Sequence, residues 1–525
     1  MTTSISKHSK DNGKKNWAII PLSGILLLLT LTAIYGILNF LSQRMQLIVI
    51  VSLLGFTITL LYVFLFPSAL KHQIKYLSII GLLVILPFQN SINLLLGFSI
   101  RPLTLGLPIF FLIDDLIVFL FSRRRVIRKP YIFEVVTIGL ILLAISYLPA
   151  SASAGSLIGG IYSFIFQFQG IFIYFVIRNL PLKEDQSKKL LVIMLISLVI
   201  MVGYGIVEFL WAQYSHIDWL VAHSNHPFVQ DQANLISGYY RAAQTGPASY
   251  RSQSFELEFI SFGYSGYVLS SLLLAVLVLA PRWRKKPWMW VALVLAVLGL
   301  ASSVTISAIG VFFLSFCIVG FNGLLHRGNA KFVWVLLPVL AVGGLVVTYM
   351  LSPQLATPIL QRLENLSLSS RHAVHIRFNQ FYLEKVKPFL FFGRGTGTSG
   401  PGSTKFFPFG EYGYFVENEY LSNITEWGIL GLLVYLLFMF SLGWHILRKK
   451  RQYRYGTLGH ALGIGLLSVF IGYVLIGFYH NVWGQSSIDV QFLTLLALWT
   501  RGSKLFKSGL ANLGHKQSEE YRSSG

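Results

Sequence analysis

Runs of about 20 apolar residues recur along almost the whole chain, and they constrain its fold more than any other feature. A run of this length can cross the hydrocarbon core of a bilayer as a helix, which satisfies its own backbone hydrogen bonds. Only 12% of the residues are charged, whereas soluble domains contain about 25%. The sequence therefore predicts an all-α polytopic membrane protein and excludes a soluble globular fold.

We predict about fourteen membrane-spanning helices from the positions of these runs. The runs at 288–302 and 304–324 could instead form one broken helix, so the expected number is about 12–14. The expected spans are 17–41, 46–67, 76–97, 104–121, 131–149, 157–177, 190–212, 255–280, 288–302, 304–324, 332–351, 427–447, 457–479 and 484–500.

The formal net charge of +22 sets the orientation of these helices. Most of the 42 Lys and Arg residues lie in the two tails and in every second connection, as at 123–129 and 448–454. Positively charged connections stay on the cytoplasmic side of a membrane, so both termini are predicted to be cytoplasmic. Because orientation accounts for the charge, we expect no nucleic-acid partner.

Two outer segments are long, and we expect them to form a shared binding cavity rather than two simple lids. Many-pass membrane proteins mostly keep such loops short, so a long loop with arginines, glycines and carboxylates is expected to carry chemistry. The predicted order is a cytoplasmic tail (1–16), N-terminal helices (17–212), a first outer loop (213–254), central helices (255–351), a large catalytic outer loop (352–426), C-terminal helices (427–500) and a cytoplasmic tail (501–525).

The basic residues on the outer side are mostly arginines, and the topology does not require them. The guanidinium fork suits phosphate and carboxylate groups, so these residues are candidates for an anion site. Arg371 and Arg377 are six residues apart and do not share one helix face, so a solvated helix lying on anionic headgroups is the alternative. The outer basic residues are Arg44, Arg101, Arg241, Arg251, Arg362, Arg371, Arg377, Lys385, Lys387, Arg394 and Lys405.

Further candidates lie in the second half of the large loop. The run Gly393-Arg394-Gly395-Thr396-Gly397 can offer backbone N–H groups to an oxygen anion. Glu417 and Asn418 stand before a helix expected near Trp427, where a carboxylate could remove a proton from a hydroxyl group. The alternative is an interfacial acid that forms a salt bridge or caps a helix. We expect Glu426 to be structural, because negative charge is favoured at a helix start.

The sequence predicts no metal site and no cofactor. His216, His223 and His226 resemble a metal cluster only superficially, since nothing fixes them and Pro227 interrupts the segment. Buried acids in apolar spans would suit a proton-coupled transporter, but no paired broken-helix repeat accompanies them. These acids are Asp114, Asp115, Glu134, Glu208 and Asp489.

Several motifs in one order resemble the O-antigen ligase and polymerase superfamily, the Wzy/WaaL-like membrane glycosyltransferases. The resemblance covers about 240–450 in detail and the whole chain in topology. The matching motifs are Arg251 in the first outer loop, Ser370-Arg371, Phe392-Gly393-Arg394-Gly395, Glu417-Asn418-Glu419-Tyr420-Leu421 and Glu426-Trp427-Gly428-Ile429-Leu430-Gly431.

The resemblance implies a metal-independent glycosyltransferase with the helical glycosyltransferase C fold in the bacterial inner membrane. Its substrate would be an oligosaccharide linked to undecaprenyl diphosphate, bound on the periplasmic side within the lipid bilayer. Arg251 and Arg371, with Arg377 and Arg394, would hold the diphosphate. Glu417, beside Asn418, would act as the base. A polysaccharide chain-length regulator and a flippase are the protein partners that such an enzyme implies.

One departure favours a polymerase within this family. Ligases that attach glycan to lipid A–core usually have histidine at the position of Glu417, and an acidic residue is more usual in polymerase-like members. We therefore predict polymerisation of repeat units into surface polysaccharide, with a ligase as the alternative. A lipid-linked oligosaccharide flippase is the alternative outside the enzymes, although a transporter does not need the large outer loop.

Overall fold

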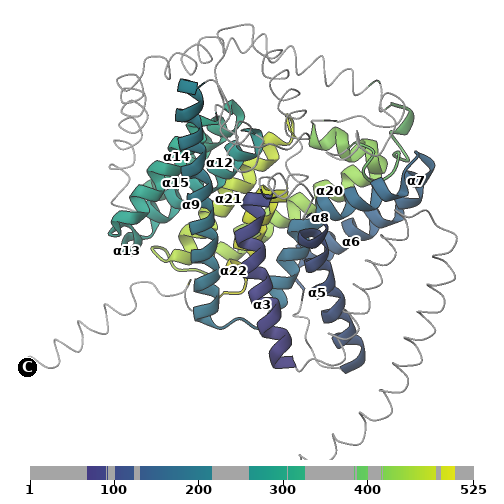
Figure 1. Ribbon diagram of the computed structural model, residues 1–525, viewed down its shortest axis with the longest axis horizontal. Coiled ribbons are helices and arrows are strands. Elements are labelled where there is room, and N and C mark those ends of the chain that lie inside the picture. The colour runs from purple at the N-terminus through teal and green to yellow at the C-terminus, as the bar shows by residue number, and fades with distance from the viewer. Residues whose placement is uncertain are drawn as a thin grey trace, which may run out of the picture. The chain divides into compact units, whose positions relative to one another are not determined.

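The computed structural model describes residues 68–89, 92, 101–122, 130–215, 259–303, 305–325, 384, 387–399, 416, 418–480, 486–502 and 506 (Figure 1). The chain divides into a unit of residues 1–74 and a unit of residues 75–525. The described part of the first unit is the beginning of α3, and every contact below lies within the second. The expected spans 17–41, 46–67 and 332–351 and the first outer loop lie outside the described residues.

Most of the described residues are helical, and they contain no strand. They are α3 (Ser68–Ile85), η1 (Leu86–Phe88), α5 (Arg101–Ser122), α6 (Ile132–Ser146), α7 (Leu148–Ser153), α8 (Leu157–Asn179), α9 (Glu184–Ser215), α12 (Phe259–Leu279), α13 (Pro281–Arg284), α14 (Pro287–Ser302), α15 (Ile306–Leu325), η3 (Lys387–Phe389), α20 (Glu419–Lys450), α21 (Leu458–Ile476) and α22 (Ser486–Thr500).

The prediction of a helical membrane protein is confirmed. Eight of the described helices are long and apolar enough to cross a bilayer, and α14 and α22 are shorter apolar helices. The runs at 288–302 and 304–324 form two helices, α14 and α15, rather than one broken helix. The total of fourteen spans stays a prediction, since part of the chain lies outside the described residues.

The centre of the second unit is α12, which is buried along nearly its whole length. It contacts α14, α15, α21, α22 and α9. Small residues permit this close packing, because a Cβ atom on Gly465 of α21 would lie 3.0 Å from Leu272 Cδ2 on α12. Membrane helices associate through such small-residue contacts, where dispersion rather than water exclusion is the driving force.

The outward faces of the peripheral helices are apolar. On α20, Leu433, Leu437, Phe440 and Trp444 are all more than half exposed and recur at helical spacing. A row of large exposed apolar side chains would be a liability in water, but it is the expected surface against lipid.

Candidate functional site

The segment Gly393–Ser399, called the glycine turn below, is fixed to the membrane helices by hydrogen bonds. Thr396 Oγ1 donates to the carbonyl oxygen of Ala144 on α6 at 2.6 Å. The carbonyl oxygen of Thr396 accepts from Ser151 Oγ on α7 at 2.7 Å. Trp427 Nε1 on α20 donates to Thr396 Oγ1 at 3.0 Å. This part of the large loop is therefore hydrogen-bonded to three helices, α6, α7 and α20.

The glycine turn binds an anion, but the anion is Glu426 of the chain itself. Its carboxylate accepts from Ser399 Oγ at 3.1 Å, from Ser399 N at 3.3 Å and from Gln167 Nε2 at 3.1 Å. Gly397 adds a backbone N–H. The backbone N–H groups that have acceptors within the chain are those of Gly393, Arg394, Gly395, Gly397, Thr398 and Ser399. These backbone donors are therefore already paired within the chain.

Glu426 is hydrogen-bonded within the fold and stands two residues before a kink. α20 joins two helices across Gly428, whose φ is 67° and ψ −167°, and the helix expected near Trp427 corresponds to the part of α20 after this kink. This conformation is open essentially only to glycine. A Cβ atom at Gly428 would also overlap the carbonyl oxygen of Phe391. The kink thus makes room for the backbone that leads into the glycine turn.

Arg394 is the one predicted diphosphate ligand among the described residues. Its backbone N donates to the carbonyl oxygen of Thr425 at 2.7 Å, which fixes the residue against α20. Its guanidinium carbon lies 4.3 Å from the centre of the Phe389 ring, a cation–π contact, and only 9% of the residue is exposed. Arg394 is thus held at the same end of the helices as Glu426.

Asn418 caps the start of α20. Its Oδ1 accepts from the backbone N of Tyr420 and of Leu421, each at 3.0 Å, and its Nδ2 donates to the carbonyl oxygen of Phe478 at 2.9 Å. An asparagine cap satisfies backbone donors that the first helical turn leaves unpaired. Through these hydrogen bonds Asn418 fixes the first turn of α20 against the residues that follow α21.

The remaining predicted site residues are outside the part of the chain that the structure describes. Glu417, Arg251, Arg371 and Arg377 all fall there, and so do the histidines of the first outer loop. Their roles stay predictions from the sequence.

Glu419, next to the cap, is one of a few polar residues that line a small and mostly apolar cavity between α6, α8 and α20. The cavity measures about 30 Å³, which is room for about one water molecule. Gln167, Ser422 and Asn423 also line it, and Trp427 contributes an aromatic wall. Glu419 itself is only 5% exposed. A buried carboxylate therefore faces a space that can hold a polar group.

A second buried acid, Asp489 of α22, lies close enough to Glu419 for the two charges to interact. Glu419 and Asp489 are called the acidic pair below. Asp489 is 2% exposed and packs against α8 at Gly170, where a Cβ atom would lie 3.0 Å from the Asp489 Cβ. Its Oδ1 has no hydrogen-bond partner among the described residues. On α8, Gln167 stands one helical turn before Gly170, so α8, α20 and α22 converge on the acidic pair.

The sequence analysis assigned no role to the acidic pair, although ionisable residues in apolar helices are visible in the sequence. Ionisable residues inside membrane helices are costly and are functional candidates by default. Asp489 was recognised as an intramembrane acid, and Glu419 stood within a quoted motif. Their proximity could not be read from residues that lie on different helices.

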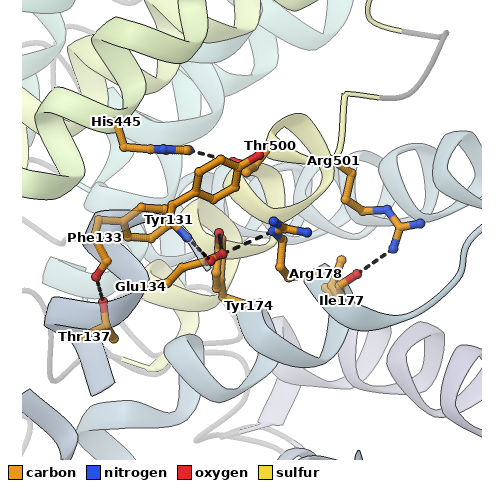
Figure 2. Close-up of polar contacts among 10 residues, drawn as sticks. All are labelled: Tyr131, Phe133, Glu134, Thr137, Tyr174, Ile177, Arg178, His445, Thr500 and Arg501. Carbon is orange, nitrogen blue, oxygen red and sulfur yellow. Dashed lines mark hydrogen bonds and ion pairs between the residues drawn. The ribbon is translucent and has the colours of Figure 1, made fainter. Parts of the chain in front are cut away.

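A different polar region lies toward the other ends of α8, α20 and α22 and is shown in Figure 2. The carboxylate of Glu134 accepts from the backbone N of Tyr131 at 2.7 Å, from Tyr174 Oη at 2.6 Å and from Arg178 Nε at 3.2 Å. The Arg178 guanidinium also lies 4.9 Å from the centre of the Tyr131 ring. Tyr131, Glu134, Tyr174, Arg178 and His445 are called the Glu134 cluster below.

His445 brings α20 and α22 into this cluster. Its ring lies 4.5 Å, between centroids, from the ring of Tyr131 and 4.5 Å from that of Phe133. Its Nε2 is 3.3 Å from Thr500 Oγ1 on α22. Beside it, Arg501 donates to the carbonyl oxygen of Ile177 at 2.9 Å, at the end of α8 where free carbonyls favour a cation (Figure 2). Each charge here has a partner, so the cluster joins helices and offers no reactive group.

Comparison with models of known protein families finds no match to this chain, and comparison with curated protein sequences finds no significant match.

Proposed function

We propose that this protein is a glycosyltransferase that polymerises oligosaccharide repeat units carried on undecaprenyl diphosphate into surface polysaccharide. The observation that carries the proposal is the joining of two motif segments. Residues 391–399 and 418–431, far apart in the sequence, are hydrogen-bonded into one polar region at one end of the helices. The acidic pair and Arg394 lie at that same end.

The chemistry of the proposal divides between arginines and a carboxylate. The acceptor hydroxyl attacks the anomeric carbon of the carrier-linked glycan, and the bond from that carbon to the diphosphate oxygen breaks. The electron pair leaves with undecaprenyl diphosphate, whose growing charge Arg251 and Arg371 stabilise, aided by Arg377 and Arg394. The hydroxyl proton passes to Glu417 as general base. Asn418, its neighbour in the sequence, caps the start of α20. The step needs neither a metal ion nor a redox cofactor.

The architecture belonging to this proposal is a glycosyltransferase C fold with about fourteen spans. The protein would lie in a bacterial inner membrane, with both termini cytoplasmic and the glycine-turn end at the periplasmic face. A chain-length regulator and a flippase would be its protein partners.

Reconstitution tests the proposal directly. The purified full chain in lipid vesicles receives an undecaprenyl-diphosphate-linked repeat unit, and the products are resolved by mass spectrometry. A ladder of carrier-linked oligomers supports a polymerase. Transfer that occurs only after lipid A–core is added would make the protein a ligase, and the absence of transfer to any acceptor would overturn the proposal.

Variants of the two loop arginines test the diphosphate site. We expect Arg251→Ala and Arg371→Ala each to abolish the ladder at unchanged protein yield, and the corresponding lysine variants to rescue poorly, because a point charge replaces a fork. Arg362→Ala is the matched control for Arg371→Ala, since Arg362 lies in the same large loop outside the motifs. Normal ladders in both test variants would contradict the assignment.

A further inference from the structure

An apolar groove runs between α9 and α14, with α12 as its floor. It has a volume of about 350 Å³. Leu269 and Leu273, one helical turn apart on α12, form the floor and are buried. The rims carry Ile196 and Ile200 on α9 and Trp288 on α14, which are all about half exposed. The groove therefore opens sideways onto the surface that faces the bilayer.

A basic and aromatic turn closes one end of the groove. The segment Arg282–Lys286, which joins α12 to α14 through α13, presents Arg282, Lys285 and Lys286 as exposed cations. Lys286 Nζ lies 4.4 Å from the centre of the Trp283 ring, and that ring packs edge-on against Trp288 at 6.4 Å. Since Trp288 also lines the groove, the cations and the apolar channel form one continuous surface.

The groove is short enough to lie within one leaflet of a membrane. On α14 its lining extends from Trp288 to Leu295, which is about 10 Å along the axis at about 1.5 Å per residue. The hydrocarbon core is about 30 Å thick, so a single leaflet supplies about 15 Å. A groove that begins near a cationic turn and ends within one leaflet can hold part of one acyl chain with its headgroup at the turn.

We propose that this groove binds an anionic phospholipid, with one acyl chain between α9 and α14 and the headgroup phosphate against Arg282–Lys286. Charge complementarity selects an anionic over a zwitterionic headgroup, because each Lys or Arg near the headgroups attracts negative lipid. Trp283 and Trp288 occupy the depth that amphipathic rings favour. The bound lipid fills the space that α9 and α14 leave above α12. This inference is independent of the proposed enzymatic function.

Native mass spectrometry of the delipidated full chain tests the inference. The probes are phosphatidylglycerol and phosphatidylcholine with identical acyl chains. We expect the wild-type protein to retain one phosphatidylglycerol in preference to phosphatidylcholine. The double variant Arg282→Gln/Lys285→Gln should lower phosphatidylglycerol affinity about thirtyfold, which corresponds to about 2 kcal/mol. Its affinity for phosphatidylcholine should not change.

Two control variants distinguish a specific lipid site from nonspecific attraction of anionic lipid to exposed cations. Arg451→Gln/Arg454→Gln removes two exposed cations after α20, away from the groove, and should leave phosphatidylglycerol binding unchanged. Val291→Trp fills the groove from its exposed rim and should lower the affinity for both lipids. Equal binding of both lipids by the wild type, or equal losses in the two double variants, would overturn the inference. Displacement of phosphatidylglycerol by undecaprenyl phosphate at equal concentration would also overturn it, by assigning the groove to a carrier lipid.

Discussion

The Glu134 cluster, centred on α6 and α8, and the acidic pair, on α20 and α22, both contain buried carboxylates, yet their polar atoms are paired very differently. In the Glu134 cluster, one carboxylate receives three donors, including the Arg178 guanidinium (Figure 2). In the acidic pair, two carboxylates lie within reach of each other's charge, and Asp489 Oδ1 has no hydrogen-bond partner among the described residues. Glu419 faces a cavity of about 30 Å³ as well.

The difference separates a structural group from a candidate functional one. A buried charge that is fully paired holds elements together, and removal of one partner leaves the other uncompensated. Asp489 Oδ1, buried without a hydrogen-bond partner among the described residues, is costly to keep, and such atoms are candidates for contact with a ligand or a proton. Glu426 shows that a position near the acidic pair does not by itself make a carboxylate a functional candidate. It lies at the same end of the helices but is fully paired, like Glu134.

The largest effect is expected at the Glu134 cluster. Glu134→Ala removes the partner of the buried Arg178 and should destabilise the protein by about 3–5 kcal/mol. Fluorescence-detected size-exclusion chromatography after heating would measure the loss of folded protein. Glu134→Gln keeps an acceptor for the Tyr131 N–H and should cost less, about 1–3 kcal/mol. If Glu134→Ala melted at the wild-type temperature, the Glu134 cluster would not stabilise the fold, and its contrast with the acidic pair would fail.

A smaller loss is expected where α20 meets the glycine turn. Gly428→Ala places a side chain at φ 67° and against the carbonyl oxygen of Phe391, which should cost about 1–3 kcal/mol. The matched control is Gly139→Ala on α6, where nothing lies within 4 Å and helix propensity predicts a gain of up to about 1 kcal/mol. Thermal unfolding of both variants gives the comparison. Equal melting temperatures of the two variants would mean that the kink at Gly428 does not anchor the glycine turn.

The helices could be predicted because hydropathy is a property of the sequence alone. The run at 157–177 became α8, Leu157–Asn179, and the run at 457–479 became α21, Leu458–Ile476. The run at 427–447 corresponds to the part of α20 after the kink at Gly428, whereas the part before the kink, from Glu419, was not predicted because Asn423 and Thr425 are polar. In the structure each donates to a carbonyl oxygen four residues earlier in the helix, Glu419 and Leu421 respectively, so the polar stretch is helical and buried. A hydropathy value does not reflect hydrogen bonds between a polar side chain and the backbone of its own helix.

The candidate site was predicted less completely, for a related reason. The glycine turn was correctly seen as a group of backbone donors for an oxygen anion. The sequence did not reveal that its anion is the Glu426 carboxylate, 27 residues further along the chain from Ser399. The acidic pair likewise depends on α20 and α22 meeting in space. The roles of Arg251, Arg371, Arg377 and Glu417 stay predictions.

The smallest change in stability, and the sharpest contrast, is expected at Asp489. Asp489→Asn removes a buried charge whose Oδ1 has no hydrogen-bond partner among the described residues, and it relieves the repulsion with Glu419. We expect the free energy of unfolding to change by less than about 1 kcal/mol or to rise, whereas Glu134→Gln lowers it. Thermal unfolding of the two variants side by side measures the sign. If the acidic pair serves the proposed transfer reaction, Asp489→Asn should also shorten the polymer ladder at unchanged protein yield. The opposite result would be a loss in the free energy of unfolding as large as that of Glu134→Gln, together with a normal polymer ladder. Asp489 would then be a structural residue, because neutralising a carboxylate is costly when it has strong partners in the fold.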